Sequence, residues 1–405
     1  MRTIARRGLV FTVMSWCVFL QAANAGTITV TSSADDGGPN TLRTAIANAT
    51  SGDTINFSAD MTVTLMSGTL ELTQSLTIDG GSNIVAIDGN GAVRVFTVDP
   101  GVTAQLSNLT IQLGNTNAGV GNGGGVHNSG TLTLTNCIVA LNTAGNNGGG
   151  IFNASGALTL INTTVSGNTI NGYYGGGIYN ASGTVTLTNS TVSGNHGFFG
   201  DLGGGIFNSD MLTLTNSTVS GNGGSGDLGG GIYNEGTANL TNSTISGNDG
   251  TVNRPGGGGI YNSGTVNLTN STISGNRVPV YASSGSISFI NTINTDGCSV
   301  SAGSITDGGG NIDTGTGCGF GSSSQSNVTA SSLNLGPLQN NGGPTQTMMP
   351  GSGSVAINVI ACAPALPADQ RGYARPDPPS ASLPTPCDVG AVEYYDAVFA
   401  NGFES

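Results

Sequence analysis

Residues 203–222 read GGGIFNSDMLTLTNSTVSGN, and related runs occur six times between Gly123 and Ser283. Each copy opens with three glycines, an aliphatic residue, an aromatic residue or histidine, and an asparagine. The opening glycines are Gly123, Gly148, Gly175, Gly203, Gly229 and Gly257, which are 25, 27, 28, 26 and 28 residues apart. A period of this length is typical of stacked structural units and not of a mixed globular domain.

Three asparagines recur at fixed places in every copy. The first set is Asn128, Asn153, Asn180, Asn208, Asn234 and Asn262; the second is Asn136, Asn162, Asn189, Asn216, Asn242 and Asn270; the third is Asn142, Asn168, Asn195, Asn222, Asn248 and Asn276. The large length differences between copies fall in the loop after the third set. Identical amides stacked at the strand spacing of ~4.8 Å can hydrogen-bond along the stack. The pattern predicts an all-β fold, a single parallel β-helix in which each coil pairs with its neighbours.

Alternation within each copy identifies the expected core. The residue before the aromatic position should form one buried column, made of Val126, Ile151, Ile178, Ile206, Ile232 and Ile260. A leucine in the following strand should form a second buried column, made of Leu134, Leu160, Leu187, Leu214, Leu240 and Leu268. Successive side chains of a strand point to opposite faces, so the residues between these positions should face outward.

Composition excludes several classes of partner. The chain has 405 residues, 69 of them glycine, only 8% charged residues and no lysine. Without the first 25 residues, 6 arginines remain against 22 acidic residues, a net charge of 6 − 22 = −16. So acidic a chain is poorly suited to bind nucleic acid or an anionic membrane surface.

The N-terminus has the features of an export signal. Arg2, Arg6 and Arg7 precede an apolar run over 8–20, and Ala23-Asn24-Ala25 offers a small-residue cleavage site, so we expect residues 1–25 to be removed after Ala25. A membrane anchor is the alternative, but the apolar run is too short to span a bilayer. No later segment is apolar enough to span one.

Cysteine usage fits an oxidising compartment. Cys298 and Cys318 bracket a glycine-rich loop, and Cys362 and Cys387 bracket a proline-rich one. We predict two disulfides and not metal ligands, because neither pair has CxxC spacing or a nearby histidine. Cys137 follows an asparagine where the other copies carry Ser or Thr, and is expected to be a buried free thiol.

A short amphipathic helix is expected near the N-terminus. Leu42, Ala45, Ile46 and Ala49 fall at helical spacing, and Asn40 or Thr41 can cap the start. Such a helix would cover the open edge of the first coil. The run Thr41–Ile46 followed by 52–57 (GDTINF) resembles the N-terminal domain named for its Cys-Ser-Leu-Arg-Glu-Ala motif, although Asn40, Thr41 and Thr44 differ from that motif. Residues 26–122 are assigned to this cap and to irregular coils.

The rest of the chain carries two further resemblances. The six repeats over 123–283 resemble those of polymorphic outer-membrane proteins and other secreted β-helices of the pectin-lyase-like superfamily, which implies a right-handed helix. Residues 284–394, expected to form C-terminal coils, resemble the choice-of-anchor Q family through 335–338 (LGPL), 341–345 (NGGPT), 369–372 (DQRG) and 387–393 (CDVGAVE). That resemblance implies an exported surface protein whose tail, 395–405, is a sorting signal.

Catalytic chemistry has few candidate residues in the repeats. Glycosidases need paired carboxylates, and lyases need a base and often calcium. Asp201 and Asp227 each precede a glycine triplet, with Asp210 and Glu235 near the next corner. These four residues are the candidates for a Ca²⁺ site or an acid pair, but solvated aspartates in turns are the preferred interpretation. Asp369 and Arg371 should form a structural ion pair.

Two outward patterns, one of aromatic residues and one of threonines, are candidate binding surfaces. The aromatic column consists of His127, Phe152, Tyr179, Phe207, Tyr233 and Tyr261, and its five aromatic rings from Phe152 onward are the predicted ligand-binding residues. We expect an exposed ladder that stacks on sugar rings or on a partner. The alternatives are a cover formed by 363–386 or by 396–405, or a bulge that turns the rings into the core.

Threonines form a second outward pattern. One column holds Thr133, Thr159, Thr186, Thr213, Asn239 and Asn267, and its neighbour holds Thr135, Ile161, Thr188, Thr215, Thr241 and Thr269. Spacings of ~6.6 Å along strands and ~4.8 Å between coils would give a flat hydroxyl grid of the kind that ice-binding β-helices use. Threonine is also a good strand former on a solvated face, and the grid is interrupted.

Together these features predict an exported, extracellular or cell-surface β-helical protein. We expect it to act like an adhesin or an envelope protein, binding a surface or carbohydrate ligand without catalysis and without a resident cofactor. The alternative is a polysaccharide lyase or glycoside hydrolase of the pectin-lyase-like superfamily, because a fold alone does not decide function.

Overall fold

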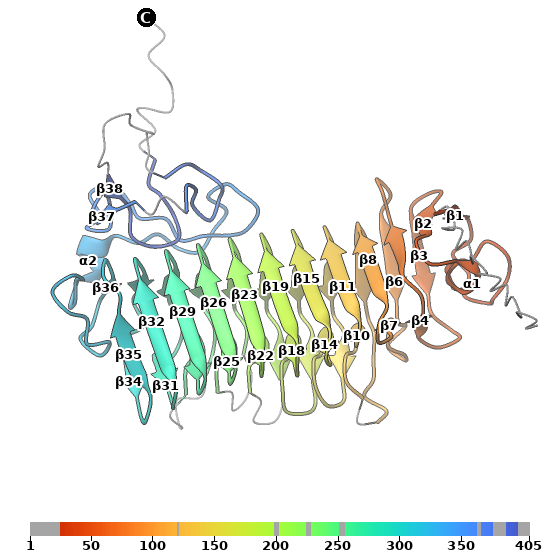
Figure 1. Cartoon of the computed structure of the whole chain (residues 1–405), viewed down its shortest axis with the longest axis horizontal. Helices are drawn as coiled ribbons and strands as arrows, with labels where there is room; N and C mark the ends of the chain where they lie inside the picture. The colour runs from red at the N-terminus through yellow and green to blue at the C-terminus, as the bar shows by residue number, and fades with distance from the viewer. Residues whose placement is uncertain are drawn as a thin grey trace, which may run out of the picture.

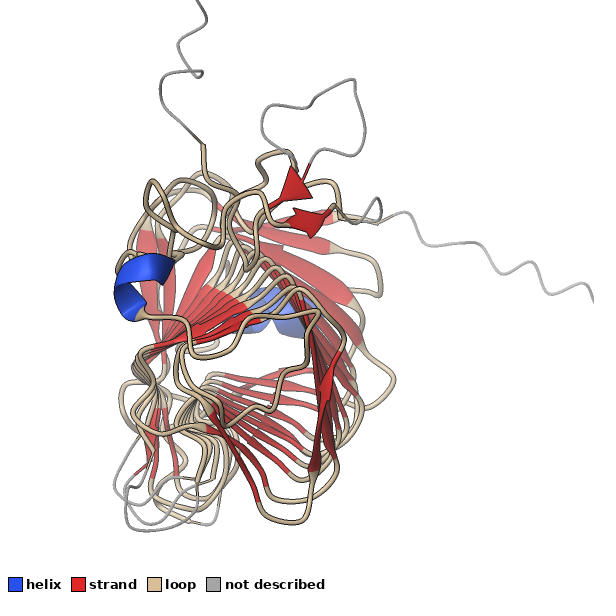
Figure 2. Ribbon diagram, turned by 90° about the vertical axis from the view of Figure 1, so that its left-hand side faces the viewer, coloured by secondary structure: helices blue, strands red, loops and turns tan. Residues whose placement is uncertain are grey.

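The structure is a computed structural model that describes residues 25–119, 121–197, 202–223, 228–250, 256–362, 366–375 and 386–395. The chain forms one long stack of coils with a sheet along each of three sides (Figure 1). Strands in consecutive coils pair in parallel, with repeats aligned in register, for example Ile178 with Ile206. Figure 2 shows the coils end on, with the three sheets as the walls of the stack. The predicted all-β parallel β-helix is therefore confirmed.

The first wall, within the described residues, is a 12-stranded sheet. Its strands are β1 (Thr27–Val30), β2 (Thr54–Phe57), β5 (Leu76–Asp79), β8 (Thr103–Ser107), β11 (Thr131–Thr135), β15 (Ala157–Ile161), β19 (Thr184–Thr188), β23 (Met211–Thr215), β26 (Thr237–Thr241), β29 (Thr265–Thr269), β32 (Ser286–Ile290) and β35 (Ser304–Asp307).

The second wall, likewise counted over the described ranges, is an 11-stranded sheet. Its strands are β3 (Met61–Thr64), β6 (Val85–Asp88), β9 (Leu109–Gln112), β12 (Ile138–Ala140), β16 (Thr164–Ser166), β20 (Thr191–Ser193), β24 (Thr218–Ser220), β27 (Thr244–Ser246), β30 (Thr272–Ser274), β33 (Ile293–Asn294) and β36 (Ile312–Asp313).

The third wall is a 10-stranded sheet in the part of the chain that the structure describes. Its strands are β4 (Leu70–Leu72), β7 (Phe96–Val98), β10 (Val126–Asn128), β14 (Ile151–Asn153), β18 (Ile178–Asn180), β22 (Ile206–Asn208), β25 (Ile232–Asn234), β28 (Ile260–Asn262), β31 (Val280–Ala282) and β34 (Cys298–Val300). A small sheet of β13 (Thr143–Ala144), β17 (Thr169–Ile170) and β21 (His196–Gly197) lies in the loops between the second and third walls.

Leucine, isoleucine and valine from all three walls fill the interior of the stack. Both predicted columns are buried, with exposures between 0% and 1% from Val126 to Ile260 and from Leu134 to Leu268. The corner between the first and second walls is a two-residue turn that starts with an asparagine of the second set. These asparagines have positive φ, from 47° at Asn242 and Asn270 to 53° at Asn136. Asparagine tolerates this left-handed conformation better than most residues, which explains its recurrence at this corner.

The first and third sets of asparagines form buried hydrogen-bonded ladders, as predicted. In the first set, Nδ2 of each residue donates to Oδ1 of the next at 2.7–2.9 Å. In the third set, the corresponding distances are 2.8–3.0 Å. All these amides point their N–H groups toward the C-terminal end. The ladders satisfy polar groups that would otherwise be costly to bury.

Helix α1 (Leu42–Asn48) lies at the N-terminal end of the stack. The Thr41 side chain caps it by accepting from the Thr44 amide, and Leu42, Ala45 and Ile46 are its buried residues. Arg43 forms an ion pair with Asp35, whose carboxylate is fully buried, at 2.7 Å. The helix packs against β1, β2 and β4, so it covers the first coil as expected.

The expected C-terminal coils extend only to β36. Residues 324–333, which include helix α2 (Ala330–Leu333), then lead into a returning segment, 334–395, whose described parts lie back along the stack (Figure 1). Its described parts contain one short antiparallel strand pair, β37 (Ile360–Ala361) with β38 (Pro386–Cys387), and three isolated antiparallel bridges, such as Gln339 with Thr347. The prediction of coils over 284–394 is therefore wrong from residue 334 onward, because the described parts of that segment pack on the outside of existing coils.

Cysteine chemistry follows the prediction. Disulfides join Cys298 to Cys318 and Cys362 to Cys387, and Cys137 is a buried free thiol. The Cys137 thiol donates to the carbonyl oxygen of Leu106, and burial raises its pKa to about 11. The disulfides indicate an oxidising environment of the extracellular kind. None of the helices in the described ranges is long and apolar enough to cross a membrane.

Candidate binding surface

The aromatic column lies on the outward face of the 10-stranded sheet. Its residues pair in register from His127 to Tyr261, and Tyr281 extends the column by one coil. Neighbouring rings are in contact, with centroids 4.6 Å apart and nearly parallel planes at Tyr233 and Tyr261. The predicted one-ring-per-coil ladder is thus present. Tyr281 was missed because no glycine triplet precedes it.

The expectation that this ladder is exposed is wrong. Phe152 and Tyr233 are 8% exposed and Phe207 is 2% exposed, while Tyr179 and Tyr261 are half-buried. Burial also raises the pKa of Tyr179 and of Tyr233 and lowers that of His127. The rings do not join the main core, so the bulge that would turn them inward is not observed either.

Part of the cover is Tyr174, from the variable loop before the third glycine triplet. Tyr174, directly before a glycine triplet, places its ring 4.6 Å from Phe207 and 5.7 Å from Tyr179. The first glycine of that triplet, Gly175, has φ +67°, and a Cβ there would lie 2.4 Å from the carbonyl oxygen of Ile178. Only glycine permits this tight return of the loop over the strand. The other predicted cover, from 363–386 or 396–405, stays a prediction, because 363–365, 376–385 and 396–405 lie outside the described residues.

The returning segment covers part of the 11-stranded sheet. The Gln370 side chain lies at the centre of this contact: it accepts from Thr244 Oγ1 at 2.6 Å and donates to Thr218 Oγ1 at 2.8 Å. The Ala391 amide donates to Thr272 Oγ1 at 3.1 Å. These three threonines occupy equivalent positions on β24, β27 and β30, and all three strands are buried on both faces. On β16 and β20 the outward residues remain half-buried.

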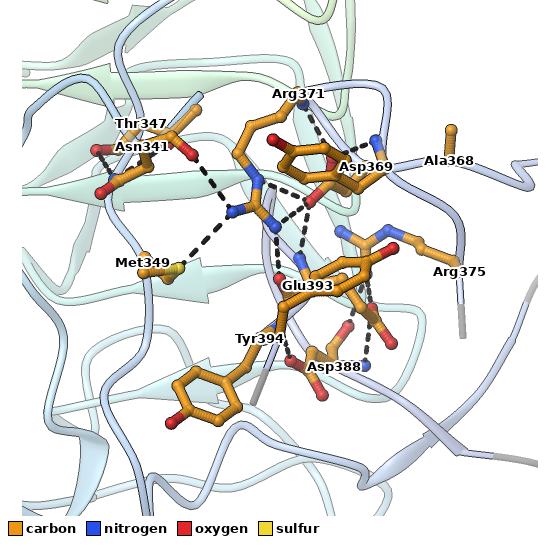
Figure 3. Close-up of polar contacts among 12 residues, drawn as sticks. Asn341, Thr347, Met349, Ala368, Asp369, Arg371, Arg375, Asp388, Glu393 and Tyr394 are labelled. Carbon is orange, nitrogen blue, oxygen red and sulfur yellow. Dashed lines mark hydrogen bonds and ion pairs between the residues drawn. The ribbon is translucent and has the colours of Figure 1, made fainter. Parts of the chain in front are cut away.

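A cluster of buried charges holds the returning segment together (Figure 3). Arg371 forms an ion pair with Asp369 at 2.7 Å, which confirms the predicted pair, and its guanidinium lies 4.5 Å from the ring centre of Tyr373. Arg375 forms an ion pair with Glu393 at 2.9 Å. Each of these charges is also hydrogen-bonded, as buried ions require. The cluster is structural, because backbone groups of the same segment use its polar atoms.

Asp388 and Glu393 have perturbed titration in this cluster. Burial raises the pKa of Asp388, against hydrogen bonds from the amides of Tyr394 and Asn358. Burial, with the nearby Asp388 carboxylate, raises the pKa of Glu393 to about 7 in spite of Arg375. Both carboxylates are about 1% exposed, so neither is accessible to a ligand as the segment stands.

The 12-stranded sheet has an open outer face over the six repeats. Every outward side chain on its strands from β11 to β29 is exposed or half-buried. The two predicted threonine columns are in register across these strands, with Thr186 beside Thr213 and Thr188 beside Thr215. A third column begins at Thr131 and continues through Ala157, Thr184, Met211, Thr237 and Thr265. We call this grid of three columns the hydroxyl face.

The calcium candidates do not form a site in the described chain. Asp201 and Asp227 lie outside the described residues. Asp210 accepts a hydrogen bond from the Gly183 amide at 2.7 Å, which is a turn contact, and Glu235 is exposed. Within the described ranges, no group of three or more His, Cys, Asp or Glu side chains is placed to hold a metal ion.

Sequence reasoning missed Gln370 and its threonine partners. The threonines were part of the repeat and therefore read as strand formers. Gln370 lies 126 residues from Thr244 in a segment without periodicity, so no spacing linked the two. The motif 369–372 (DQRG), which carries part of the resemblance, is one of the parts of the segment that contact the coils.

Comparison with known proteins supports the fold and goes no further. No protein-family model matches the chain, and no curated protein matches it in sequence. Among solved structures, the chain is similar to the crystal structure of pectate lyase Pel9A, with a TM-score of 0.56 and 17% sequence identity, over 91% of this chain and 96% of that one. At that identity the similarity shows a shared fold, a β-solenoid of the pectin-lyase-like type.

Proposed function

We propose that this protein is exported, resides at the cell surface, and binds a neutral, ordered polysaccharide through its hydroxyl face without cleaving it. The observation that carries this proposal is the openness of that face. The outward face of the 10-stranded sheet carries the buried and half-buried aromatic column, and that of the 11-stranded sheet is partly covered by the returning segment. On the 12-stranded sheet the outward residues of every regular coil, mostly threonines, are exposed or half-buried.

The chemistry of the face suits a carbohydrate. Its columns present threonine hydroxyls and the amides of Asn239 and Asn267, of which the second donates to the first at 2.8 Å. Hydroxyls and amides both donate and accept hydrogen bonds, as sugar hydroxyls do. A flat array spaced ~4.8 Å by ~6.6 Å offers many weak contacts to a ligand with its own regular repeat. An extended polysaccharide surface meets that requirement better than a small molecule.

The charge of the chain favours a neutral ligand. The net charge of −16 from residue 26 onward would repel an anionic polymer at low ionic strength. Polygalacturonate, the kind of anionic substrate that the name pectate lyase implies, is thus a poor candidate for this chain. The resemblances of the six repeats and of the C-terminal part to exported surface proteins support the location.

A cleaving enzyme is the second candidate, favoured by the similarity to Pel9A. The charged residues considered next give this candidate little support, because they are engaged in contacts within the fold. Arg43, Arg371 and Arg375 are in ion pairs with buried carboxylates, and Asp79 and Asp307 accept hydrogen bonds from their own or adjacent coils. Glycoside hydrolysis needs two carboxylates free to face a substrate, and these carboxylates are occupied within the fold.

Matched valine substitutions test the binding face. Valine keeps the shape and strand preference of threonine and removes the hydroxyl. The double variant T186V/T213V should lose most retention on an insoluble neutral polysaccharide, whereas T164V/T191V, on the uncovered part of the 11-stranded sheet, should retain it. Equal retention by both variants would refute the hydroxyl face as the site. An ice-recrystallisation assay on the same pair separates the polysaccharide from an ice lattice.

A further inference from the structure

Asp53 has little exposed surface, and no cationic side chain of the described residues pairs with its carboxylate. Its side chain accepts from the Thr50 amide at 2.7 Å, from Thr50 Oγ1 at 3.0 Å and from the Gly26 amide at 2.6 Å. The residue is 6% exposed, and none of the ion pairs found in the described chain includes it. Hydrogen bonds from Thr50 and Gly26 lower its pKa, so it is ionised at neutral pH. Buried charges are ordinarily paired, and this one lacks only its counter-charge.

Gly26 is held in place from both sides. Its nitrogen contacts Asp53, and its carbonyl oxygen accepts from the Thr54 amide at 2.9 Å. The next residue, Thr27, begins β1 and pairs with Thr54 of β2. A side chain at this position would begin only 3.2 Å from Asp53 Oδ1, so glycine allows the close approach. The preceding residue, Ala25, is exposed.

This contact falls at the predicted cleavage site. The small-residue motif Ala23-Asn24-Ala25 ends directly before Gly26. We propose that export processing between Ala25 and Gly26 creates an α-ammonium that forms an ion pair with Asp53 and fixes β1 on the first coil. Hydrolysis by an export peptidase adds one water: its oxygen goes to the Ala25 carbonyl carbon, which becomes a carboxylate, and both of its protons go to the Gly26 nitrogen, which becomes the ammonium. The same nitrogen that donates as an amide then donates as a cation.

The ion pair has a defined pH dependence. A free α-amine ordinarily has a pKa of about 7.7–8.0, and the Asp53 carboxylate raises it in the folded state. The stability that this pair contributes is therefore present below the ordinary amine pKa and is lost as pH rises through the raised value. Among the described groups on β1, β2 and the turn at Thr50, Asp53 is the charged side chain that contacts Gly26; the neighbouring donors and acceptors are uncharged.

The absence of lysine makes the amine directly measurable. A chain that starts at Gly26 has a single primary amine, so an acylating N-hydroxysuccinimide ester reports on that group alone. Two proteins should be compared, one starting at Gly26 and one starting at Ala25, in which the amine lies one residue away from Asp53. At pH 7.5 the Gly26 protein should react several-fold more slowly, since each unit of raised pKa lowers the free-amine fraction about tenfold. Equal rates and equal pH profiles would overturn the proposal.

A variant pair supplies an independent test. D53N in the Gly26 protein should restore the faster rate, whereas D60N, which changes an exposed carboxylate, should not. If D53N fails to fold, the melting temperatures of the proteins that start at Gly26 and at Ala25 provide the test instead. The Gly26 protein should have the higher melting temperature at pH 6, and the difference between the two should vanish above pH 10. N-terminal sequencing of the exported protein must also begin at Gly26; any other start refutes the inference. None of these results depends on the proposed ligand.

Discussion

Asn276 donates through Nδ2 to Oδ2 of Asp296 at 2.6 Å, and this contact ends the third asparagine ladder. The Asn276 backbone amide donates to the same oxygen at 3.2 Å. The amide N–H groups of this ladder all point toward the C-terminal end of the stack. At that end the ladder stops at Asp296, whose carboxylate accepts hydrogen bonds and donates none. Burial raises the pKa of Asp296, and the hydrogen bonds from Asn276 oppose that rise.

Replacing Asp296 should separate its acceptor role from its charge. D296A leaves two buried donors of Asn276 without a partner and should lower the free energy of unfolding by about 1–3 kcal/mol. D296N keeps an acceptor oxygen and removes a desolvated charge, so its loss should be smaller. Chemical denaturation of both variants at pH 7 measures the difference, with D60N as a surface control. Equal losses for D296A and D296N would show that the charge, and not the acceptor, matters.

The leucine column should dominate stability in the repeats. Leu187 is fully buried among leucines of the adjacent coils. L187A should cost about 2–5 kcal/mol, because it removes buried surface and leaves a cavity. T188V, one residue away and facing outward, should change the free energy of unfolding by less than about 0.5 kcal/mol. A neutral L187A would mean that the coil register is wrong.

Thiol counting should find one free cysteine in the chain from residue 26. Cys137 is buried with a pKa raised to about 11, so a thiol reagent should not modify it in the native state. After denaturation without a reductant, one thiol should react, and after reduction, five. Reaction of three or more thiols before reduction would disprove at least one of the two disulfides. The C137S variant should lose the one thiol that reacts after denaturation. It should still fold, since Ser190 and Ser217 occupy the position of Cys137 in other repeats.

The returning segment should contribute less to the free energy of unfolding as pH rises from about 4.5 to 7. The folded pKa of Glu393, about 7, exceeds its ordinary value of 4.5, so the folded state binds more protons across this window. The free energy of unfolding must then fall with rising pH, by at most ~1.4 kcal/mol for each unit of pKa difference.

E393Q isolates this effect because it cannot ionise. The melting temperature of the unmutated protein relative to E393Q should fall between pH 4.5 and 7.5. E71Q, which alters an exposed glutamate, should show no such trend. A difference that is constant or rises with pH would contradict the assignment of the shifted titration to Glu393.

How far the sequence predicts this structure depends on periodicity. The core position of Leu187 and the ladder contacts of Asn195 follow from strict spacing, because one coil repeats the environment of the next. The burial of Phe207 did not follow, because its cover is a loop whose length changes from copy to copy. The alternation correctly predicts that the ring faces away from the core, but it cannot predict what lies above the ring.

The C-terminal part shows the same limit. The ion pair of Asp369 with Arg371 is local and was predicted, whereas the contact of Gln370 with Thr244 joins distant segments through tertiary packing. Asp296 was also missed, since the spacing of the repeat changes near residue 291. The open hydroxyl face around Thr186 was identified from strand alternation, although only the structure distinguishes it from the covered faces.

The most direct test of the account measures binding and turnover in the same sample. The chain from Gly26 onward would be incubated with insoluble neutral polysaccharides and with polygalacturonate, each with and without Ca²⁺, while bound protein and newly formed reducing ends are quantified. We predict retention on at least one neutral polysaccharide, little on polygalacturonate, and no new reducing ends in any sample. Release of new reducing ends from any polymer, or retention that T186V/T213V leaves unchanged, would contradict binding without cleavage at the hydroxyl face.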